Sequence, residues 1–448
     1  MLKTFRSFAL LLPVLLGCSP SSGEEVSTAS QNTENRPELD PAELKSITAP
    51  SYKSSPGEKQ ECLGRVVFDV GGSVEWPTYY DGNSPNLFAR SFSANVFHSS
   101  DFMRFGNVQI AVFGPLTSET RDEVRSSLPS VEIPRLEKSI SDARARIATL
   151  KRAGRLTSSQ EWEMTQDETM IENRTAKIEE IRKQYIPFAS GGLPDSEGYG
   201  YTEAGGGSQE PNYSVFRSYV TRGKYIYIFE THKAFKIASD YDTHAKEFAA
   251  VLARFKPRGP NEIPTALGIC IPFGFISDDG KTTSDLRQSF RFPDALGVLY
   301  TVHVGSHQYM KTVVPLLEAT SFASVGNMGT EEDVKVKPFI TQRINPKKAS
   351  IGEMTAIQGG VAAKIKLPGG TPYETYQVFT GYSGRPNIEE LPYIFVELNT
   401  TTMSMAAELK SNPPAFEQSK GRLDVLLKSM RLRPTTPAMP ALVNANRK

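Results

Sequence analysis

The residue types that perform ester hydrolysis are present in this chain, but their spacing does not match a hydrolase motif. Ester and lipid hydrolases place a serine on a sharp turn in the pattern Gly-x-Ser-x-Gly, and the sequence does not contain this pattern. The nearest segment is Gly381-Tyr-Ser-Gly384, whose last glycine comes one position early. We therefore interpret it as a turn between strands expected around Val378 and Ile394.

Residues that bind metals or cofactors are also poorly placed. The histidines are His98, His232, His244, His303 and His307, and the last two are the sole close pair. One His-x-x-x-His pair without a third ligand does not predict a metal site. Asp278-Asp-Gly280 resembles the start of a calcium loop, but Lys, Thr and Ser occupy the later ligand positions, so we expect a turn. The sequence has no P-loop and no dinucleotide fingerprint, and we expect no cofactor.

One cysteine lies in a context that predicts lipid attachment. Lys3 and Arg6 precede an apolar run from Phe8 to Leu16, which is typical of a signal peptide and too short to span a bilayer. The run ends in Leu15-Leu-Gly-Cys18, which resembles the bacterial lipobox. We therefore expect residues 1–17 to be removed and Cys18 to be lipidated. The alternatives are a signal peptide cut elsewhere or an unmodified cysteine.

The position of the lipid and the composition of the next segment suggest how the chain is placed in the cell. Ser19, rather than aspartate, follows the cysteine, and by the sorting rule for bacterial lipoproteins this implies the periplasmic face of the outer membrane. Residues 18–57 are rich in Ser, Glu, Thr, Asn and Pro and predict a disordered tether. The lipid anchor is thus the one expected contact with the membrane.

The rest of the chain is long enough for two domains. We place them at 58–260 and 261–436, followed by a tail at 437–448. Lysine and arginine number 51 against 50 acidic residues, a formal net charge of +1, which argues against nucleic acid as a partner. Cys62 and Cys270 could form a disulfide in the periplasm or remain two buried thiols, and the sequence leaves both possibilities open.

An internal repeat predicts the fold class. Tyr213-Ser-Val-Phe216 matches Tyr376-Gln-Val-Phe379, and each is followed by a strand-like run ending in glutamate, Lys224–Glu230 and Pro392–Glu397. Each half also begins with a cysteine before an apolar strand and ends with a helix and a basic residue. We therefore expect an α+β fold made of two duplicated α+β domains.

The first copy contains an additional helical segment. Leu136, Ile140, Ala143, Ile147 and Leu150 repeat at spacings of four and three, as on a helix that packs lengthwise against another. A second helix is expected to begin with the capping box Ser158-Ser-Gln-Glu161, to carry a stripe at Ile171, Ile178, Ile181 and Tyr185, and to end at Pro187. This predicts an inserted antiparallel hairpin at about 133–186. It could thicken the core, or project toward a partner with Arg144, Arg146, Lys151, Arg152 and Arg155 on its flanks.

The openings of the two halves resemble a known family. The first opening is Glu61-Cys-Leu-Gly-Arg65 with Val67-Phe-Asp-Val70, and the second is Gly268-Ile-Cys270, after Ile263-Pro, with Phe273-Gly-Phe-Ile276; Phe292-Pro-Asp294 follows. Together these segments resemble the two-domain immunity lipoproteins that protect bacteria against type VI secretion lipase effectors. The resemblance covers most of the chain from about residue 58 to residue 436. It implies that the two domains close like a claw around a lipase or phospholipase delivered to the periplasm.

We therefore expect an immunity protein that is not an enzyme, whose partner is a cognate lipase or phospholipase effector. The resemblance carries over no individual contact residues. One alternative is a periplasmic ligand-binding or envelope-assembly lipoprotein, with a small molecule or lipid between the two copies. Another is a hydrolase whose groups meet only in space, with Asp69, Glu75, His98 and Ser383 as the residues available for it.

Overall fold

The computed structural model describes residues 59–78, 101–203, 212–235, 238–278, 280, 282–308, 339–366, 372–386, 388, 391–401, 409 and 411–433. The expected signal peptide, Cys18, the tether, the tail and His98 lie outside these residues. No described helix is long and apolar enough to cross a membrane.

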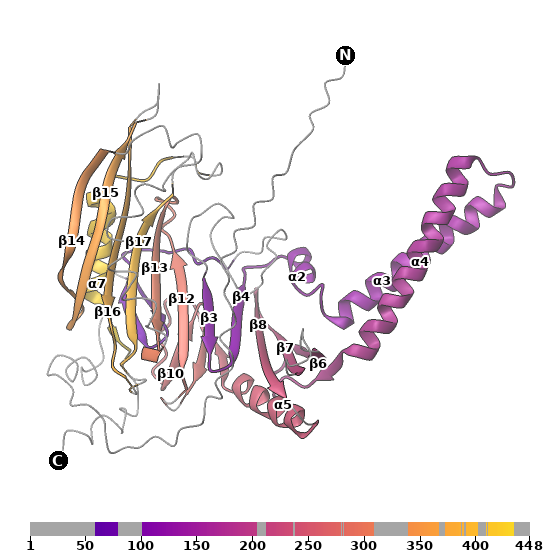
Figure 1. The fold of residues 1–448 in the computed structure, drawn as a ribbon, viewed down its shortest axis with the longest axis horizontal. Helices are drawn as coiled ribbons and strands as arrows, with labels where there is room; N and C mark the ends of the chain where they lie inside the picture. Colours follow the sequence, from indigo (N-terminus) through magenta and orange to yellow (C-terminus); the bar gives the residue numbers. More distant parts are fainter. Residues whose placement is uncertain are drawn as a thin grey trace. The chain divides into compact units, whose positions relative to one another are not determined.

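Within the described residues, twelve antiparallel strands form one sheet (Figure 1). In spatial order they are β14 (Phe339–Ile351), β15 (Met354–Ile365), β16 (Tyr373–Tyr382), β17 (Tyr393–Thr400), β13 (Val298–Gly305), β12 (Ser284–Phe290), β3 (Phe102–Phe105), β4 (Val108–Phe113), β8 (Tyr225–Phe235), β7 (Asn212–Arg222), β6 (Ser196–Glu203) and β5 (Ile186–Phe188). Aromatic and β-branched residues dominate strands such as β8 and β17, which suits a pleated sheet. The predicted α+β class is confirmed.

The strand order reads alike in both directions from the centre of the sheet. Outward from β3 the strands run β3-β4-β8-β7-β6-β5, and outward from β12 they run β12-β13-β17-β16-β15-β14. β3 and β12 pair with each other, with Phe102 opposite Arg287 and Arg104 opposite Asp285. The two halves are therefore joined by backbone hydrogen bonds, and the sheet itself sets their relative orientation.

Two small sheets exchange strands between the halves. The opening hairpin of the first half, β1 (Gln60–Leu63) and β2 (Val66–Asp69), pairs with β18 (Arg431–Leu432) at the end of the second half. The opening hairpin of the second half, β10 (Gly268–Ile271) and β11 (Gly274–Ser277), pairs with β9 (Phe255–Pro257) at the end of the first half. Each half thus supplies the third strand of the other half's small sheet.

The helices α5 (Ala238–Leu252) and α7 (Phe416–Ser429) lie against one face of the large sheet, which we call the inner face. One apolar core covers this face in both halves, from Phe216, Phe229 and Phe248 to Tyr376 and Leu423. Rings from the two halves also stack on each other, as Phe68 and Phe290 do with centroids 5.8 Å apart. Burial of this apolar surface stabilises both halves together.

Cys62 and Cys270 form a disulfide that joins the two opening hairpins. Gly64 and Cys270 also form a two-way backbone bridge, in which each N–H donates to the other residue's carbonyl at 2.8 Å. Gly64 has φ +56°, and a Cβ there would lie 3.0 Å from Val304 of β13, so the turn of the first hairpin and its close approach to the large sheet favour glycine.

The additional segment of the first half contains α2 (Ser118–Val124) and two long antiparallel helices, α3 (Pro129–Arg152) and α4 (Ser158–Gln184). Three members of the predicted α3 stripe are buried, Ile140, Ala143 and Ile147, whereas α4 buries Ile178 and Ile181. One detail of the prediction was wrong. The capping box of α4 joins Thr157 to Gln160, because Ser158 is already helical. The helix ends at Gln184, shortly before Pro187, which lies in β5.

The two tyrosines matched in the sequence repeat, Tyr213 and Tyr376, lie on opposite faces of the sheet. Tyr213 pairs with Ala234 on the face that also carries Glu230, which is the face opposite the core, whereas Tyr376 lies on the inner face and contacts Ser419 of α7. Ser214 is the residue of β7 that faces inward and contacts His244 of α5. Ser214 and Tyr376 therefore occupy comparable positions, one residue away from the match of the two tyrosines.

Candidate functional site

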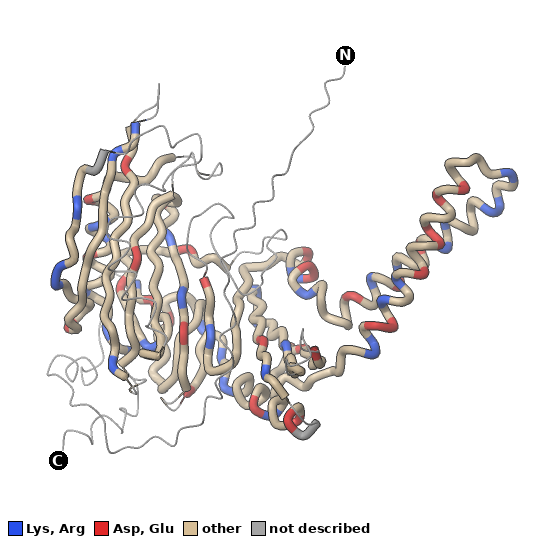
Figure 2. The backbone as a smooth tube through the Cα atoms, in the orientation of Figure 1, with Lys and Arg blue, Asp and Glu red and all other residues tan. Residues whose placement is uncertain are grey.

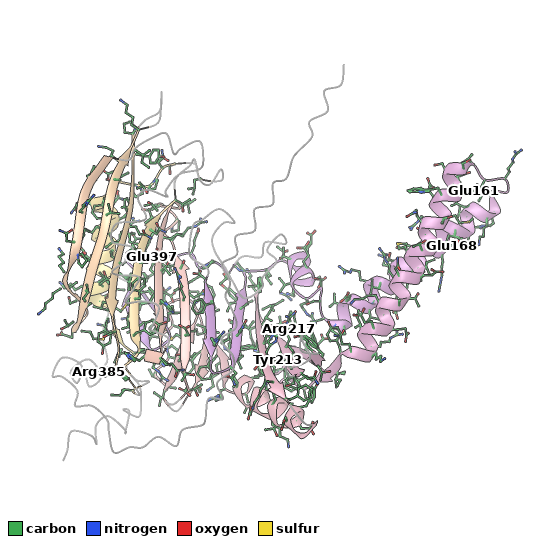
Figure 3. The ribbon with its side chains drawn as sticks, viewed as in Figure 1. Glu161, Glu168, Tyr213, Arg217, Arg385 and Glu397 are labelled. Carbon is green, nitrogen blue, oxygen red and sulfur yellow. A yellow bond between two sulfur atoms is a disulfide. The ribbon has the colours of Figure 1, made fainter. Side chains whose placement is uncertain are left out.

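The face of the sheet opposite the core, the outer face, carries linked charged residues near its centre. We call Asp285, Arg287, His303, Tyr393 and Glu397 the central cluster. Arg287 donates to Glu397 at 3.2 Å, and Gln377 donates to the other oxygen of Glu397 at 3.1 Å. Glu397 and Arg217, labelled in Figure 3, lie in different halves of the sheet.

The central cluster does not have the geometry of a catalytic relay. Asp285 Oδ1 lies 2.6 Å from both His303 Nε2 and the hydroxyl of Tyr393, which also contacts His303 Nε2. A relay instead places the acid on one ring nitrogen and the nucleophile on the other. His303 and His307 have different partners, because His307 Nδ1 donates to the carbonyl of Ser383 at 2.9 Å. Among the described residues no group of three or more His, Cys, Asp or Glu could hold a metal ion.

A fully buried carboxyl group lies beside the central cluster. Asp101 is 0% exposed, and its Oδ1 accepts hydrogen bonds from Ser289 N at 2.9 Å and Ser289 Oγ at 2.8 Å. Burial raises the pKa of Asp101 to about 8, although these hydrogen bonds and the charge of Arg287 act in the opposite direction. Asp101 therefore retains its proton at neutral pH and is a structural group rather than a charged one.

The first half has a corresponding group on the outer face, formed by Tyr199, Arg217, Glu230 and His232. Glu230 is ion-paired with Arg217 and lies 2.9 Å from His232 Nε2. Burial alone would raise the pKa of Glu230, but the hydrogen bond from His232 and the charge of Arg217 outweigh it and lower the pKa. The hydrogen bond to Glu230 in turn raises the pKa of His232. Glu230 is buried and Arg217 and His232 are partly exposed, so the two basic groups are the ones that could meet another polar surface.

Aromatic side chains lie next to this group, where α4 returns to the sheet. Tyr185 packs against Tyr199 and Tyr201, with centroids 4.7 and 5.3 Å away, and Arg217 donates to the hydroxyl of Tyr199 at 3.3 Å. The next residue, Ile186, is 53% exposed. Tyrosine and arginine are enriched among the residues that dominate protein interfaces.

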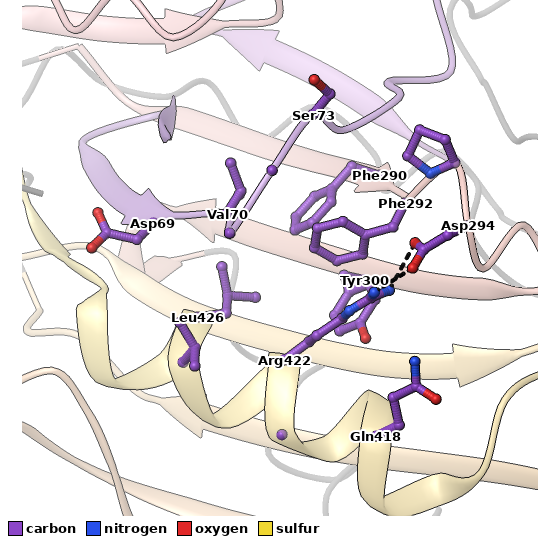
Figure 4. Close-up of a pocket in the computed structure, with 15 residues that line it drawn as sticks. Asp69, Val70, Ser73, Phe290, Phe292, Asp294, Tyr300, Gln418, Arg422 and Leu426 are labelled. Carbon is purple, nitrogen blue, oxygen red and sulfur yellow. Dashed lines mark hydrogen bonds and ion pairs between the residues drawn. The ribbon is translucent and has the colours of Figure 1, made fainter. Parts of the chain in front are cut away.

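A groove on the inner side of the molecule is lined by both halves (Figure 4). It has a volume of about 640 Å³, with Asp69, Val70 and Ser73 from the first half and Phe290, Phe292 and Tyr300 from the second. Arg422 of α7 lies over the Phe292 ring at 4.6 Å and donates to Asp294 through two N–H groups. The volume is that of a pocket for a small molecule or an apolar side chain.

The residues considered for a scattered hydrolase site have separate structural partners. The amide of Asp69 donates to Ser429 Oγ at 2.9 Å, and Glu75 is ion-paired with Arg291. Asp278 is not part of a calcium loop, because one oxygen pairs with Arg65 at 2.7 Å and the other accepts from Thr282. A buried Ser214–His244 pair also exists, but His244 is 2% exposed and burial lowers its pKa to about 4, so it is a neutral group out of reach of a substrate.

Residues 262–435 match the family model of the Tle cognate immunity protein 4 C-terminal domain. The match confirms the predicted resemblance to immunity proteins against type VI secretion lipases. The matched residues include the whole central cluster and α7. No curated protein matches the chain.

Two solved structures are similar to this chain. The immunity protein TplEi of the type VI secretion system of Pseudomonas aeruginosa is 15% identical over 85% of this chain and 98% of that one, with a TM-score of 0.45. A chain of the Tle4–Tli4 complex is 13% identical over 86% of this chain and 100% of that one, with a TM-score of 0.46.

Proposed function

We propose that this chain is an immunity protein that binds and occludes a type VI secretion lipase or phospholipase effector in the periplasm and so protects the producing cell. The observation that carries the proposal is the family match over residues 262–435. The paired charges of the outer face and the aromatic residues around Tyr185 supply chemistry suited to a protein partner. In this role the chain acts by binding and not as an enzyme.

The proposal includes a place in the cell. The lipobox at Cys18 supports lipid attachment, and Ser19 supports the periplasmic face of the outer membrane. The disulfide between Cys62 and Cys270 is consistent with an oxidising compartment. The tether at 18–57 would let the folded part reach a partner some distance from the membrane.

We also propose that the two halves arose from one duplicated α+β unit into which the first copy received α2, α3 and α4. The mirrored strand order and the reciprocal exchange of β9 and β18 support this origin. Since one half carries the helices, the duplicated scaffold presents two different surfaces to a partner. A claw-like closure would have to bend the sheet where β3 meets β12.

Affinity capture from the producing strain tests the proposed function. Mature protein with Cys18→Ser is incubated with cell extract, and bound proteins are identified by mass spectrometry. We expect one stoichiometric lipase-like protein, whose activity, once purified, falls as the immunity chain is added. Recovery of envelope-assembly components alone, or a lipase whose activity does not change, would refute the proposal.

The groove beside α7 favours a second candidate function, the binding of an apolar small molecule or lipid. Gly421 lines this groove, and a Cβ at that position would meet nothing within 4 Å. Gly421→Phe should therefore fill the groove without disturbing the helix. Native mass spectrometry of protein purified from the producing strain would detect a bound lipid in the wild-type chain but not in this variant. Equal occupancy in both, or none in either, would exclude the groove as a ligand site.

A further inference from the structure

The outer end of the α3–α4 pair is built without a core. From Ala148 to Lys177 no residue is buried, although both helices continue through this segment. Polar contacts hold it together. Arg146 donates twice to Asp167, at 3.0 and 2.6 Å, and the Thr157–Gln160 capping box begins α4. We call residues 148–177 the hairpin tip. Substitutions of side chains in the hairpin tip should therefore leave the rest of the fold intact.

The hairpin tip exposes a tryptophan. Trp162 is 64% exposed, the highest value among the large exposed hydrophobic side chains of the described residues. The other tryptophan, Trp76, is 6% exposed and packs against Phe290. Folding does not use the apolar surface of Trp162, which leaves that surface available for association.

A groove runs beside Trp162 between the two helices. It has a volume of about 600 Å³, and its lining includes Ala145, Thr149 and Leu150 of α3 and Gln166 of α4. The bidentate Arg146–Asp167 pair lies across it and fixes the spacing of the helices. An apolar side chain seated here would contact the Trp162 ring on one side and Leu150 on the other.

The two edges of the tip carry opposite charge (Figure 2). Between Ala143 and Gln160 there are five basic and no acidic residues, and between Glu161 and Asn173 there are five acidic and no basic residues. Glu161 and Glu168, labelled in Figure 3, lie on the acidic edge. Two of the basic residues are already ion-paired across the helices, Arg146 with Asp167 and Lys151 with Glu168. A segment complementary to the other charges presents acidic groups toward α3 and basic groups toward α4.

We propose that Trp162 and the groove beside it dock an apolar side chain of the effector, flanked by an acidic residue on the α3 side and a basic one on the α4 side. The inference rests on the proposed function and assigns part of its interface. Eight residues line this groove. A stable interface between two copies needs about 20–30 residues on each side, so the tip fits an added contact within a larger complex better than a dimer.

The test uses the lipase obtained by the capture experiment, in purified form. Affinity is measured for the wild-type chain, for Trp162→Ala, and for the control Val425→Ala, which removes another exposed apolar side chain, 47% exposed, from α7 on the inner side. We expect Trp162→Ala to weaken binding at least about tenfold and Val425→Ala to leave it unchanged. Circular dichroism should show equal helix content in all three. Arg152→Glu with Arg155→Glu should slow association and reduce its dependence on salt.

Fluorine NMR gives a second readout. The chain contains two tryptophans, so 5-fluorotryptophan labelling produces two resonances, and the one assigned to Trp162 should shift when unlabelled lipase is added. Equal affinities of Trp162→Ala and wild type, or an unmoved Trp162 resonance in the saturated complex, would overturn the inference while leaving the proposed function intact. A shift that appears with rising concentration of the chain alone would assign the tip to a second copy and overturn it as well. Failure to capture any lipase would instead refute the proposed function.

Discussion

Arg258 and Arg433 hold the two opening hairpins in the same way from opposite halves. Each follows a strand that pairs with the other half's hairpin, and each extends guanidinium N–H groups back to its own half. Arg258 Nε also donates to the carbonyls of Ile271 and Gly274 in the other half's hairpin, at 3.3 Å. Arg258 donates to the carbonyl of Cys62 at 3.2 Å and pairs with Glu61, and Arg433 donates to the carbonyls of Pro264 and Ala266 at 2.7 Å. Burial, together with the nearby charges of Arg65 and Arg258, lowers the pKa of Arg433 to about 9.

We expect Arg258→Met to lower the free energy of unfolding by about 3–5 kcal/mol, because Glu61 would remain buried without its charge partner. Arg433→Met leaves backbone carbonyls without donors and should cost about 1–3 kcal/mol. The measurement is urea denaturation followed by circular dichroism. Arg422→Met is the control, since its partner Asp294 is 62% exposed, and it should cost less than about 1 kcal/mol. An equal loss of unfolding free energy in all three variants would contradict the structural role of Arg258 and Arg433.

Asp101 should make stability depend on pH. Its pKa is about 8 in the folded chain against 3.8 for an unperturbed aspartate, so the folded state binds one more proton than the unfolded state between these pH values. This group therefore lowers stability as pH rises from about 4 to about 8 and causes no further change at higher pH. Asp101→Asn keeps an oxygen acceptor for Ser289 and should flatten the dependence. Urea midpoints at pH 5 and pH 8.5 check this, with the exposed Asp424→Asn as control, and parallel pH profiles for wild type and Asp101→Asn would disprove it.

The disulfide closes a separation of 208 residues. Removing it with Cys62→Ser and Cys270→Ser should lower the free energy of unfolding by about 2–5 kcal/mol, because the unfolded chain gains conformational freedom. Thermal unfolding with and without a reductant measures the effect. Wild type should lose stability on reduction and the double variant should not respond. A wild-type midpoint that ignores complete reduction would contradict the prediction.

Hydrogen exchange should separate the hairpin tip from the rest of its helices. Residues 148–177 have no buried side chain, whereas Ile140, Ile147 and Ile178 are buried near the sheet. We expect amides of the tip to exchange at least about tenfold faster than those around Ile140 and Ile178, because opening the tip exposes little apolar surface. Mass spectrometry of deuterated peptides gives the comparison. Uniform protection along both helices would show that the tip is not an independent unit.

Local patterns predicted the elements of this fold better than their pairing. The spacing of Ile140, Ala143 and Ile147 identified a buried helix face, since helical contacts recur every three or four residues. The match of Tyr213 with Tyr376 was one residue out of register, and in a sheet a shift of one residue moves a side chain to the opposite face. The exchange of β9 and β18 joins residues far apart in the chain and leaves no local signal.

The candidate site was less accessible from sequence than the fold. Cys62 and Cys270 were named as a possible pair, but their pairing depends on two hairpins meeting in space. The central cluster draws Asp285 from β12, His303 from β13 and Tyr393 from β17. Residues from three separate strands have no characteristic spacing in the sequence, so the cluster could not be predicted from it. Trp162 lay within the predicted hairpin, yet its exposure became visible only when the helices were seen to lack a buried seam beyond Ile147.

The exchanged strands also determine when this chain can fold. β2 receives β18 as its neighbour, and the hydrogen bond between Asp69 and Ser429 spans 360 residues. The first hairpin therefore waits for its third strand until residues 431–432 have reached the compartment in which the chain folds. Contacts this distant in sequence are slow to form. A nascent or truncated chain therefore stays unfinished, and its fold is completed in one late step that involves both ends.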